Sequence, residues 1–203
     1  MKEIKVLKNR IEKNQFKVLI DVLRKGGLVV LKTDTIYGFS CLASSSSALK
    51  RLRQIKKREK DKPFLLLVAN LEMLESIAFL NLAQKKYIED NRIFEKKSTT
   101  ILLKIKKKLP IEVLGSKNIN KIAIRLPKSR FLTKMIKELS EPIVSTSLNL
   151  SGEENISDPK EIKKIFSKES MPDLILNSGI CHRKKASRLI DLSDLRKIKI
   201  IRH

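Results

Sequence analysis

The residues with the clearest chemical potential lie between positions 50 and 62, where eight of thirteen side chains are Lys or Arg. Lys56, Arg58 and Lys62 stand in the last part of this run. Pro63 follows at once and restricts the backbone, so it directs the lysine before it. Phosphoryl chemistry depends mainly on positioning and on cancelling phosphate charge. The basic run therefore predicts a site for a nucleotide triphosphate or an RNA backbone.

Two clusters of hydroxyl groups are further candidates. Residues 33–38 read Thr-Asp-Thr-Ile-Tyr-Gly and follow an apolar run, the place where α/β sheets usually hold ligand contacts. Residues 145–152 read Ser-Thr-Ser-Leu-Asn-Leu-Ser-Gly, with hydroxyl and amide groups that can bind phosphate or carboxylate oxygens. Each cluster on its own also fits an ordinary cap or polar turn.

Several kinds of site are disfavoured by what the chain contains. There are two cysteines and two histidines, and they show no metal-ligand or CxxC spacing. A Ser/His/Asp triad or a histidine-based metal site is therefore not expected. The chain has neither a glycine-rich Walker loop nor a GxGxxG sequence, so neither a P-loop NTPase nor a Rossmann enzyme is supported.

The composition is ordinary for a globular protein except for its charge. The 203 residues include 45 Lys and Arg against 22 Asp and Glu, a formal charge of +23, which favours polyanionic partners. Codon drift toward A/T-rich triplets could also produce such a lysine excess. With 4% aromatic residues the chain has few platforms for stacking bases. No apolar run has the length of a membrane span, and we expect a soluble cytoplasmic protein.

Apolar spacing predicts alternating helices and strands that position these residues. Helices are expected at 14–24, from 44–47 through 55, from 70 through 77, at 85–94 and 131–139, and from the Asp-Pro pair at 158–159. Strands are expected at 28–31, 64–69, 99–106, 121–126, 142–145, 174–176, 189–191 and 198–201. Alternation early and strands late predict one α/β domain, residues 1–203, on a mixed twisted sheet.

In this order and spacing the motifs resemble the YrdC-like family, which includes the threonylcarbamoyl-AMP synthases. The resemblance runs from about residue 27 to residue 202, in the short bacterial form of the family. The most specific matches are Thr33-Asp-Thr-Ile-Tyr-Gly38, Ile55-Lys-Lys-Arg-Glu-Lys-Asp-Lys-Pro63, Ala123-Ile-Arg-Leu-Pro127 and Pro142-Ile-Val-Ser-Thr-Ser-Leu-Asn-Leu-Ser-Gly152. The family implies an open sheet flanked by helices, with a concave basic cleft.

The resemblance implies a nucleotidyltransferase that makes threonylcarbamoyl-AMP and pyrophosphate from ATP, L-threonine and bicarbonate. Mg²⁺ would be held mainly by the ATP phosphates, and no protein metal site is expected. Partner proteins would use the adenylate to modify tRNA. We also expect nonspecific RNA binding that the reaction does not need, and no membrane partner.

The family pattern also implies roles for individual residues. Threonine would contact Thr35, Lys104, Ser145 and Ser187. ATP would contact Arg58, Lys62, Thr100, Ser147, Asn155 and Arg202. Catalysis would involve Lys56, Arg58, Ser147 and Asn149.

The chain departs from the family pattern in four places. The usual Pro-Gly-Pro-Leu-Thr stretch reads Lys-Lys-Ser-Thr-Thr at 96–100, and the Gly-Gly loop reads Asn-Ser-Gly at 177–179. The Ser-Thr pair that follows reads Ser187-Arg188. In the basic motif, a small residue and a proline have become Lys57 and Glu59. These changes bear on the amino-acid substrate more than on the nucleotide.

Two alternatives to a threonylcarbamoyl-AMP synthase stay open. One is a noncatalytic protein that binds tRNA or double-stranded RNA on the same basic surface. The other is a paralogue with a different acyl or carbamoyl substrate. A binder needs the cations but not the hydroxyl and amide groups at 145–152, so that cluster favours an enzyme.

Overall fold

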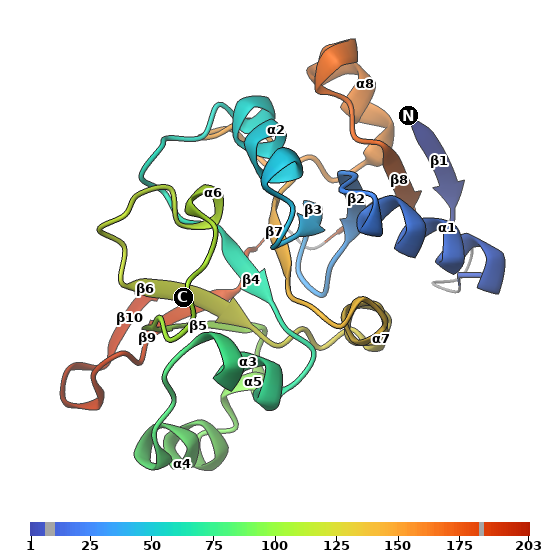
Figure 1. Cartoon of the computed structure of the whole chain (residues 1–203). Coiled ribbons are helices and arrows are strands. Elements are labelled where there is room, and N and C mark those ends of the chain that lie inside the picture. The colour runs from blue at the N-terminus through green and yellow to red at the C-terminus, as the bar shows by residue number, and fades with distance from the viewer. Residues whose placement is uncertain (7–10, 183–184) are drawn as a thin grey trace.

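A single ten-stranded mixed sheet runs through the computed structural model, which describes residues 1–6, 11–182 and 185–203 (Figure 1). The strand order is β1-β8-β2-β3-β7-β4-β6-β5-β9-β10. Its strands are β1 (Lys2–Lys5), β2 (Val29–Lys32), β3 (Tyr37–Leu42), β4 (Leu65–Leu67), β5 (Thr99–Lys104), β6 (Lys121–Arg125), β7 (Ile143–Ser147), β8 (Leu174–Asn177), β9 (Arg188–Asp191) and β10 (Lys199–Arg202). The predicted fold class, one α/β domain on a mixed open sheet flanked by helices, is confirmed.

Helices cover both faces of this sheet. They are α1 (Lys13–Arg24), α2 (Ser46–Lys56), α3 (Leu71–Ile77), α4 (Leu82–Asp90), α5 (Ile93–Lys96), α6 (Ile111–Leu114), α7 (Arg130–Leu139) and α8 (Ile162–Ile165). In Figure 1, α1 and α7 lie together on one side of the central strands, while α2 lies on the other. No helix among the described residues is long and apolar enough to cross a membrane.

The two faces of the sheet carry separate apolar cores. One core joins the buried side chains of α1 and α7 to β2, β4, β7 and β8, including Leu19, Leu31 and Met135. The larger core lies under α2 and extends past β5 and β6, with Phe39 and Phe64 fully buried in it. Apolar burial on both faces holds the strands rigidly, so the side chains at the strand ends are well positioned.

Short polar signals begin the helices as the sequence predicts. Ser45, Asn70 and Ser129 each accept a hydrogen bond from a backbone N–H in the first turn of α2, α3 and α7. Such caps satisfy N–H groups that have no partner inside the helix. The predicted strands and helices are found within a few residues of their expected bounds, with the exceptions below.

The strand β3 was not predicted, and this is the main omission from the expected fold. It lies in the middle of the sheet, antiparallel to both β2 and β7. Its residues are all buried, yet Gly38 and Ser40 give it a weak apolar pattern. Gly38 is required here because a Cβ atom would approach the Thr146 carbonyl oxygen to 2.7 Å.

Smaller differences have local causes. The helix expected at 85–94 is divided into α4 and α5, because Arg92 adopts a left-handed backbone conformation with φ 48°. The strand β1 and the short helix α6 were not predicted. Strand β1 pairs with β8, which lies far away in sequence, and its burial pattern gives little signal.

Candidate functional site

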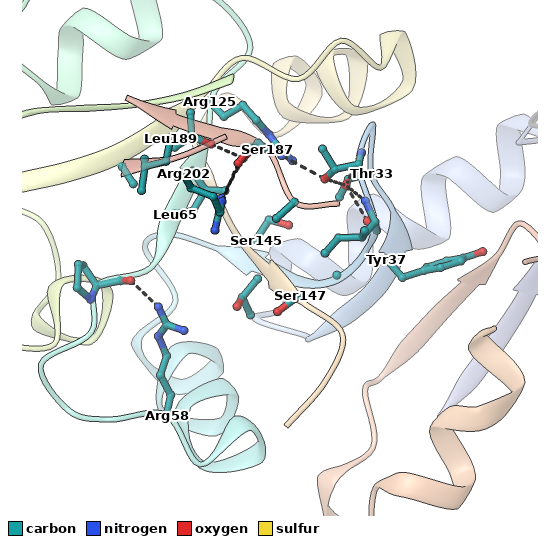
Figure 2. A pocket seen from close by; sticks show the side chains of 18 residues that line it. Thr33, Tyr37, Arg58, Leu65, Arg125, Ser145, Ser147, Ser187, Leu189 and Arg202 are labelled. Carbon is teal, nitrogen blue, oxygen red and sulfur yellow. Dashed lines mark hydrogen bonds between the residues drawn. The ribbon is translucent and has the colours of Figure 1, made fainter. Parts of the chain in front are cut away.

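A cavity of about 290 Å³ lies where β3, β7, β4, β6, β5, β9 and β10 follow one another across the sheet (Figure 2). The lining is a mixture of hydroxyl groups, small apolar groups and three guanidinium groups. The polar side chains in it come from Thr33, Thr35, Tyr37, Arg58, Thr100, Arg125, Ser145, Thr146, Ser147, Ser187 and Arg202. We call this the inner cavity. The concave basic cleft stays a prediction.

The turn between β2 and β3 places Thr35 at the inner cavity. The Thr33 hydroxyl donates to the Ile36 carbonyl oxygen at 2.7 Å and accepts from the backbone N–H groups of Thr35 and Ile36. The Thr33 and Thr35 Oγ1 atoms are 2.9 Å apart. A hydroxyl that closes its own turn in this way leaves the neighbouring threonine in a fixed position.

Arg125 and Asp34 form a buried ion pair behind Thr35. Arg125 Nη2 lies 3.3 Å from Asp34 Oδ1, and both side chains are almost fully buried. Arg125 Nη1 also donates to Thr35 Oγ1 at 3.2 Å. Burial lowers the pKa of Arg125, and the Asp34 carboxylate opposes that shift. The pair therefore compensates one buried charge and fixes the Thr35 hydroxyl.

A second group of polar side chains comes from β5, from the residue before β9 and from β10. Thr100 and Ser187 share a hydrogen bond of 2.7 Å between their hydroxyl oxygens. Arg202 Nε donates to the Ser187 carbonyl oxygen at 2.8 Å, which holds the guanidinium at the cavity wall. Burial lowers the pKa of Arg202, but an arginine starts so high that it stays charged.

The loop after α2 supplies Arg58 to the opposite wall. Arg58 Nη2 donates to the Pro63 carbonyl oxygen at 2.7 Å, and its guanidinium stacks on the Phe64 ring at 4.8 Å. Arg53 stacks on the same ring at 4.7 Å and binds the Glu59 and Lys62 carbonyl oxygens. Burial, and then the charge of Arg53, lowers the pKa of Arg58.

Lys56 is buried and does not line the inner cavity. Its Nζ atom donates to the Ser147 carbonyl oxygen at 2.7 Å, to the Asn149 carbonyl oxygen at 2.8 Å and to Asn149 Oδ1 at 2.6 Å. Ser147 Oγ also donates to Asn149 Oδ1 at 2.6 Å. All three ammonium protons are thus used to hold the chain that leaves β7. Burial, followed by the charge of Arg58, lowers the pKa of Lys56 to about 7.

Most of the predicted site residues are brought together by the structure, and three are not. Thr35, Arg58, Thr100, Ser145, Ser147, Ser187 and Arg202 line the inner cavity. Lys56 and Asn149 lie directly behind Ser147. Lys62, Lys104 and Asn155 lie outside this lining.

The surroundings of Lys62, Lys104 and Asn155 differ from those of the cavity lining. Lys62 is exposed and pairs with Glu59 at 2.6 Å, so Pro63 does not direct it into the cavity. Lys104 is an exposed residue at the end of β5. Asn155 donates to the Ile156 carbonyl oxygen, while its Oδ1 atom is buried without a hydrogen-bond donor among the described residues.

Arg125 and Asp34 were not predicted as site residues, although both lie in motifs that the sequence singles out. The available signal was an arginine inside an apolar strand sequence, Ala123-Ile-Arg-Leu-Pro127. A charge there is buried, and a buried charge needs a partner. Within the part of the chain that the structure describes, no group of three or more His, Cys, Asp or Glu side chains could hold a metal ion.

Fold and site together define a known class of α/β domain. The family model for Sua5, YciO and YrdC proteins, described as "Telomere recombination", matches residues 21–203. The chain therefore belongs to the Sua5/YciO/YrdC family.

Two relatives, one of them with a solved structure, show how similar the chain is to members of this family. It is 31% identical over 176 residues to "Uncharacterized protein YciO" of Escherichia coli strain K12, covering 86% of this chain and 82% of that protein. It is 29% identical over 169 residues to the threonylcarbamoyl-AMP synthase of Neisseria gonorrhoeae, covering 83% of this chain and 86% of that protein. The crystal structure of E. coli YciO superposes with a TM-score of 0.82 at 28% identity, covering 100% of this chain and 94% of that chain.

Proposed function

We propose that this protein is an L-threonylcarbamoyladenylate synthase. It would convert ATP, L-threonine and bicarbonate into threonylcarbamoyl-AMP and pyrophosphate. The product would pass to cytoplasmic proteins that place the threonylcarbamoyl group on tRNA. Relatives that carry this name support the proposal, among them the N. gonorrhoeae enzyme.

The observation that carries the proposal is the charge balance of the inner cavity. Arg125 is paired with Asp34. Arg58 and Arg202 form no ion pair with a carboxylate among the described residues; Arg58 is half-buried at the cavity wall, and Arg202 lies in the exposed strand β10. Two guanidinium groups without a carboxylate partner, facing a hydroxyl-lined space, favour a ligand with several negative charges, such as a triphosphate.

The chemistry needs two anions to approach each other. The threonine amine first attacks bicarbonate to give a carbamate, and water leaves. A carbamate oxygen then attacks the α-phosphorus of ATP, and the bond to the β-phosphate oxygen breaks to release pyrophosphate. Arg58 and Arg202 would reduce the repulsion between the two anions and stabilise the charge that moves onto pyrophosphate.

The hydroxyl groups would orient the amino acid. Thr35, Ser145 and Ser187 lie near one another on the lining and offer donors and acceptors for its carboxylate and its side-chain hydroxyl. Lys56 would act as a positioning residue, because its ammonium group holds the Ser147 carbonyl oxygen and so fixes the backbone there. The lining supplies hydroxyl groups but no free carboxylate cluster, so Mg²⁺ would arrive with the ATP phosphates and neutralise part of their charge.

The test is pyrophosphate release from ATP with bicarbonate, with and without L-threonine. We expect release only when both bicarbonate and L-threonine are present, and the adenylate should be detected by mass spectrometry. Tight ATP binding without turnover on any amino acid would contradict the proposal.

A second candidate is a paralogous reaction with a different amine substrate. It is favoured by the residues at 96–100 and at 187–188, which differ from the family pattern close to the proposed threonine position. Turnover with another amino acid at a higher kcat/KM than with L-threonine would select this candidate.

A further inference from the structure

A second, open cavity of about 650 Å³ adjoins the inner one. Thr35 and Ala186 line both cavities, so the two are neighbours at these residues. We call the second space the outer cavity. Its other lining residues are Lys96, Lys97, Ser98, Lys128, Lys185, Arg188 and His203.

The outer cavity has a wall that is built into the fold. Ser98 Oγ donates to Asp34 Oδ2 at 2.8 Å, and the Lys128 backbone N–H donates to the same oxygen at 3.4 Å. The Arg188 backbone N–H donates to the Ser98 carbonyl oxygen at 3.0 Å. Asp34, which also pairs with Arg125, therefore connects the wall of the outer cavity to the turn that carries Thr35.

The charges of the outer cavity are of one sign. Five of its lining residues are cationic and none is Asp or Glu: Lys96, Lys97, Lys128, Lys185 and Arg188. None of the five makes an ion pair with a carboxylate within the described ranges 1–6, 11–182 and 185–203. Lys128 Nζ donates to the Glu95 carbonyl oxygen, which is uncharged. Such a concentration of cations attracts an anion strongly.

Arg188 gives a second, independent indication. Its Nε atom is buried and has no hydrogen-bond acceptor among the described residues. An unsatisfied buried donor is costly, and a guanidinium group is shaped to bind a carboxylate or phosphate through two parallel hydrogen bonds. The Arg188 side chain lines the outer cavity, so an anion bound there would accept hydrogen bonds from this guanidinium group.

The cations at this place are a property of this sequence. Lys96 and Lys97 stand where the family pattern has Pro and Gly, and Arg188 stands where it has Thr. The structure brings these separate departures to one cavity. Drift of the overall composition would spread lysines over the surface, but it does not explain an arginine and two lysines that meet beside Thr35.

We propose that the outer cavity binds a second anionic group on the substrate whose amine lies near Thr35. The preferred substrate would then be an amino acid with a carboxylate or a phosphate on its side chain. This inference rests on the second candidate of the proposed function, a paralogous reaction with a different amine substrate, since it assumes that an amino acid other than L-threonine is carbamoylated and adenylated in the inner cavity. The space beside Thr35 is a cavity and not a flat surface, which favours a small molecule over the backbone of an RNA.

The experiment compares three amino acids in the pyrophosphate-release assay: L-threonine, L-glutamate and O-phospho-L-threonine. We expect one of the two anionic amino acids to have a kcat/KM about tenfold higher than L-threonine, the size of one charge-assisted hydrogen-bond pair. Arg188→Thr should lower this preference by about tenfold. Lys86→Gln removes an exposed lysine of α4 and should leave the preference unchanged.

A direct binding measurement distinguishes an error in this inference from an error in the proposed function. If no amino acid supports turnover, calorimetric binding of O-phospho-L-threonine that Arg188→Thr weakens about tenfold would still support the outer cavity. Turnover with L-threonine that exceeds both anionic amino acids, in wild type and Arg188→Thr alike, would overturn the inference. So would a loss of tRNA binding in Arg188→Thr with no change in amino-acid preference, because the cations would then serve RNA.

Discussion

The inner and outer cavities share Thr35 but differ in how their charges are balanced. In the inner cavity the charge of Arg125 is compensated by Asp34, while Arg58 and Arg202 donate to backbone carbonyl oxygens. In the outer cavity five cationic side chains gather without an Asp or Glu on the lining. A compensated charge is stable on its own, whereas an uncompensated one gains stability from a ligand.

The two cavities also differ in how closely their lining residues follow the family pattern. The inner cavity is formed by motifs that follow the family pattern in order and spacing. The outer cavity is formed where the chain departs from that pattern, at Lys96, Lys97 and Arg188. We infer that the reaction type is encoded in the inner cavity and that the choice of substrate is encoded in the outer one.

The largest expected effect concerns the inner cavity. Arg58→Ala should lower kcat for adenylate formation by about a hundredfold, because loss of one group that stabilises transition-state charge costs about 3 kcal/mol. Lys60→Ala is the matched control: it removes an exposed cation from the same loop and should change kcat by less than about threefold. Equal losses in steady-state assays would mean that the loop acts as a diffuse basic surface.

The connection between the cavities can be broken at Asp34. Asp34→Asn keeps the shape of the side chain but leaves Arg125, which is 3% exposed, without its compensating charge. Removal of one partner of a buried pair should lower the free energy of unfolding by about 3 kcal/mol. Urea unfolding measures this, and Ser98→Ala, which removes only a hydrogen bond to Asp34, should cost about 1 kcal/mol. A fully stable Asp34→Asn protein would show that the pair is not needed.

Lys56 predicts a pH dependence of stability. Its pKa falls from 10.5 to about 7 in the folded protein. Between these values the unfolded chain binds more protons at this residue, so its contribution to the free energy of unfolding increases as pH rises from about 7 toward 10.5. The stability of wild type relative to Lys56→Met should therefore increase from pH 6.5 to pH 9.5 in urea titrations. Lys57→Met changes an exposed neighbour and should keep the wild-type trend. A constant difference for Lys56→Met would contradict the prediction.

The smallest expected effect sharpens the contrast between exposed and buried cations. Salt screens exposed charges more than buried ones. Raising NaCl from 50 to 200 mM should therefore weaken binding of O-phospho-L-threonine to the outer cavity by a few-fold, roughly the cost of screening an exposed ion pair. The KM for ATP should change less. A larger effect of salt on ATP would indicate that the inner cavity is the more open of the two.

Much of the fold could be predicted because most elements carry a local signal. Apolar spacing and polar caps define α1, α2 and α7, and short apolar runs define β2, β4 and β6. Strand β3 was missed because Gly38 and Ser40 are explained only by close contact with β7, which the sequence does not reveal.

The site was predicted in part for a similar reason. Cations and hydroxyl groups are visible as residue types, but their directions depend on contacts made later in the chain. Lys56 points into the protein because Ser147 and Asn149 offer it three oxygen atoms. Lys62 stays at the surface because Glu59 is close enough to pair with it. The direction of neither side chain can be deduced from spacing along the sequence.

The strand order has a consequence for how the protein is made. Thr35 lies early in the chain and Arg202 near its C-terminal end, yet both line the inner cavity, and β1 pairs with β8 across most of the sequence. Contacts this distant form late in folding. A nascent chain on the ribosome that has not yet produced β9 and β10 has no wall for the inner cavity on that side and an unpaired edge at β5. Ligand binding should therefore begin only after β9 and β10 have been synthesised, and until then the open edge of β5 is the place where a chaperone is most needed.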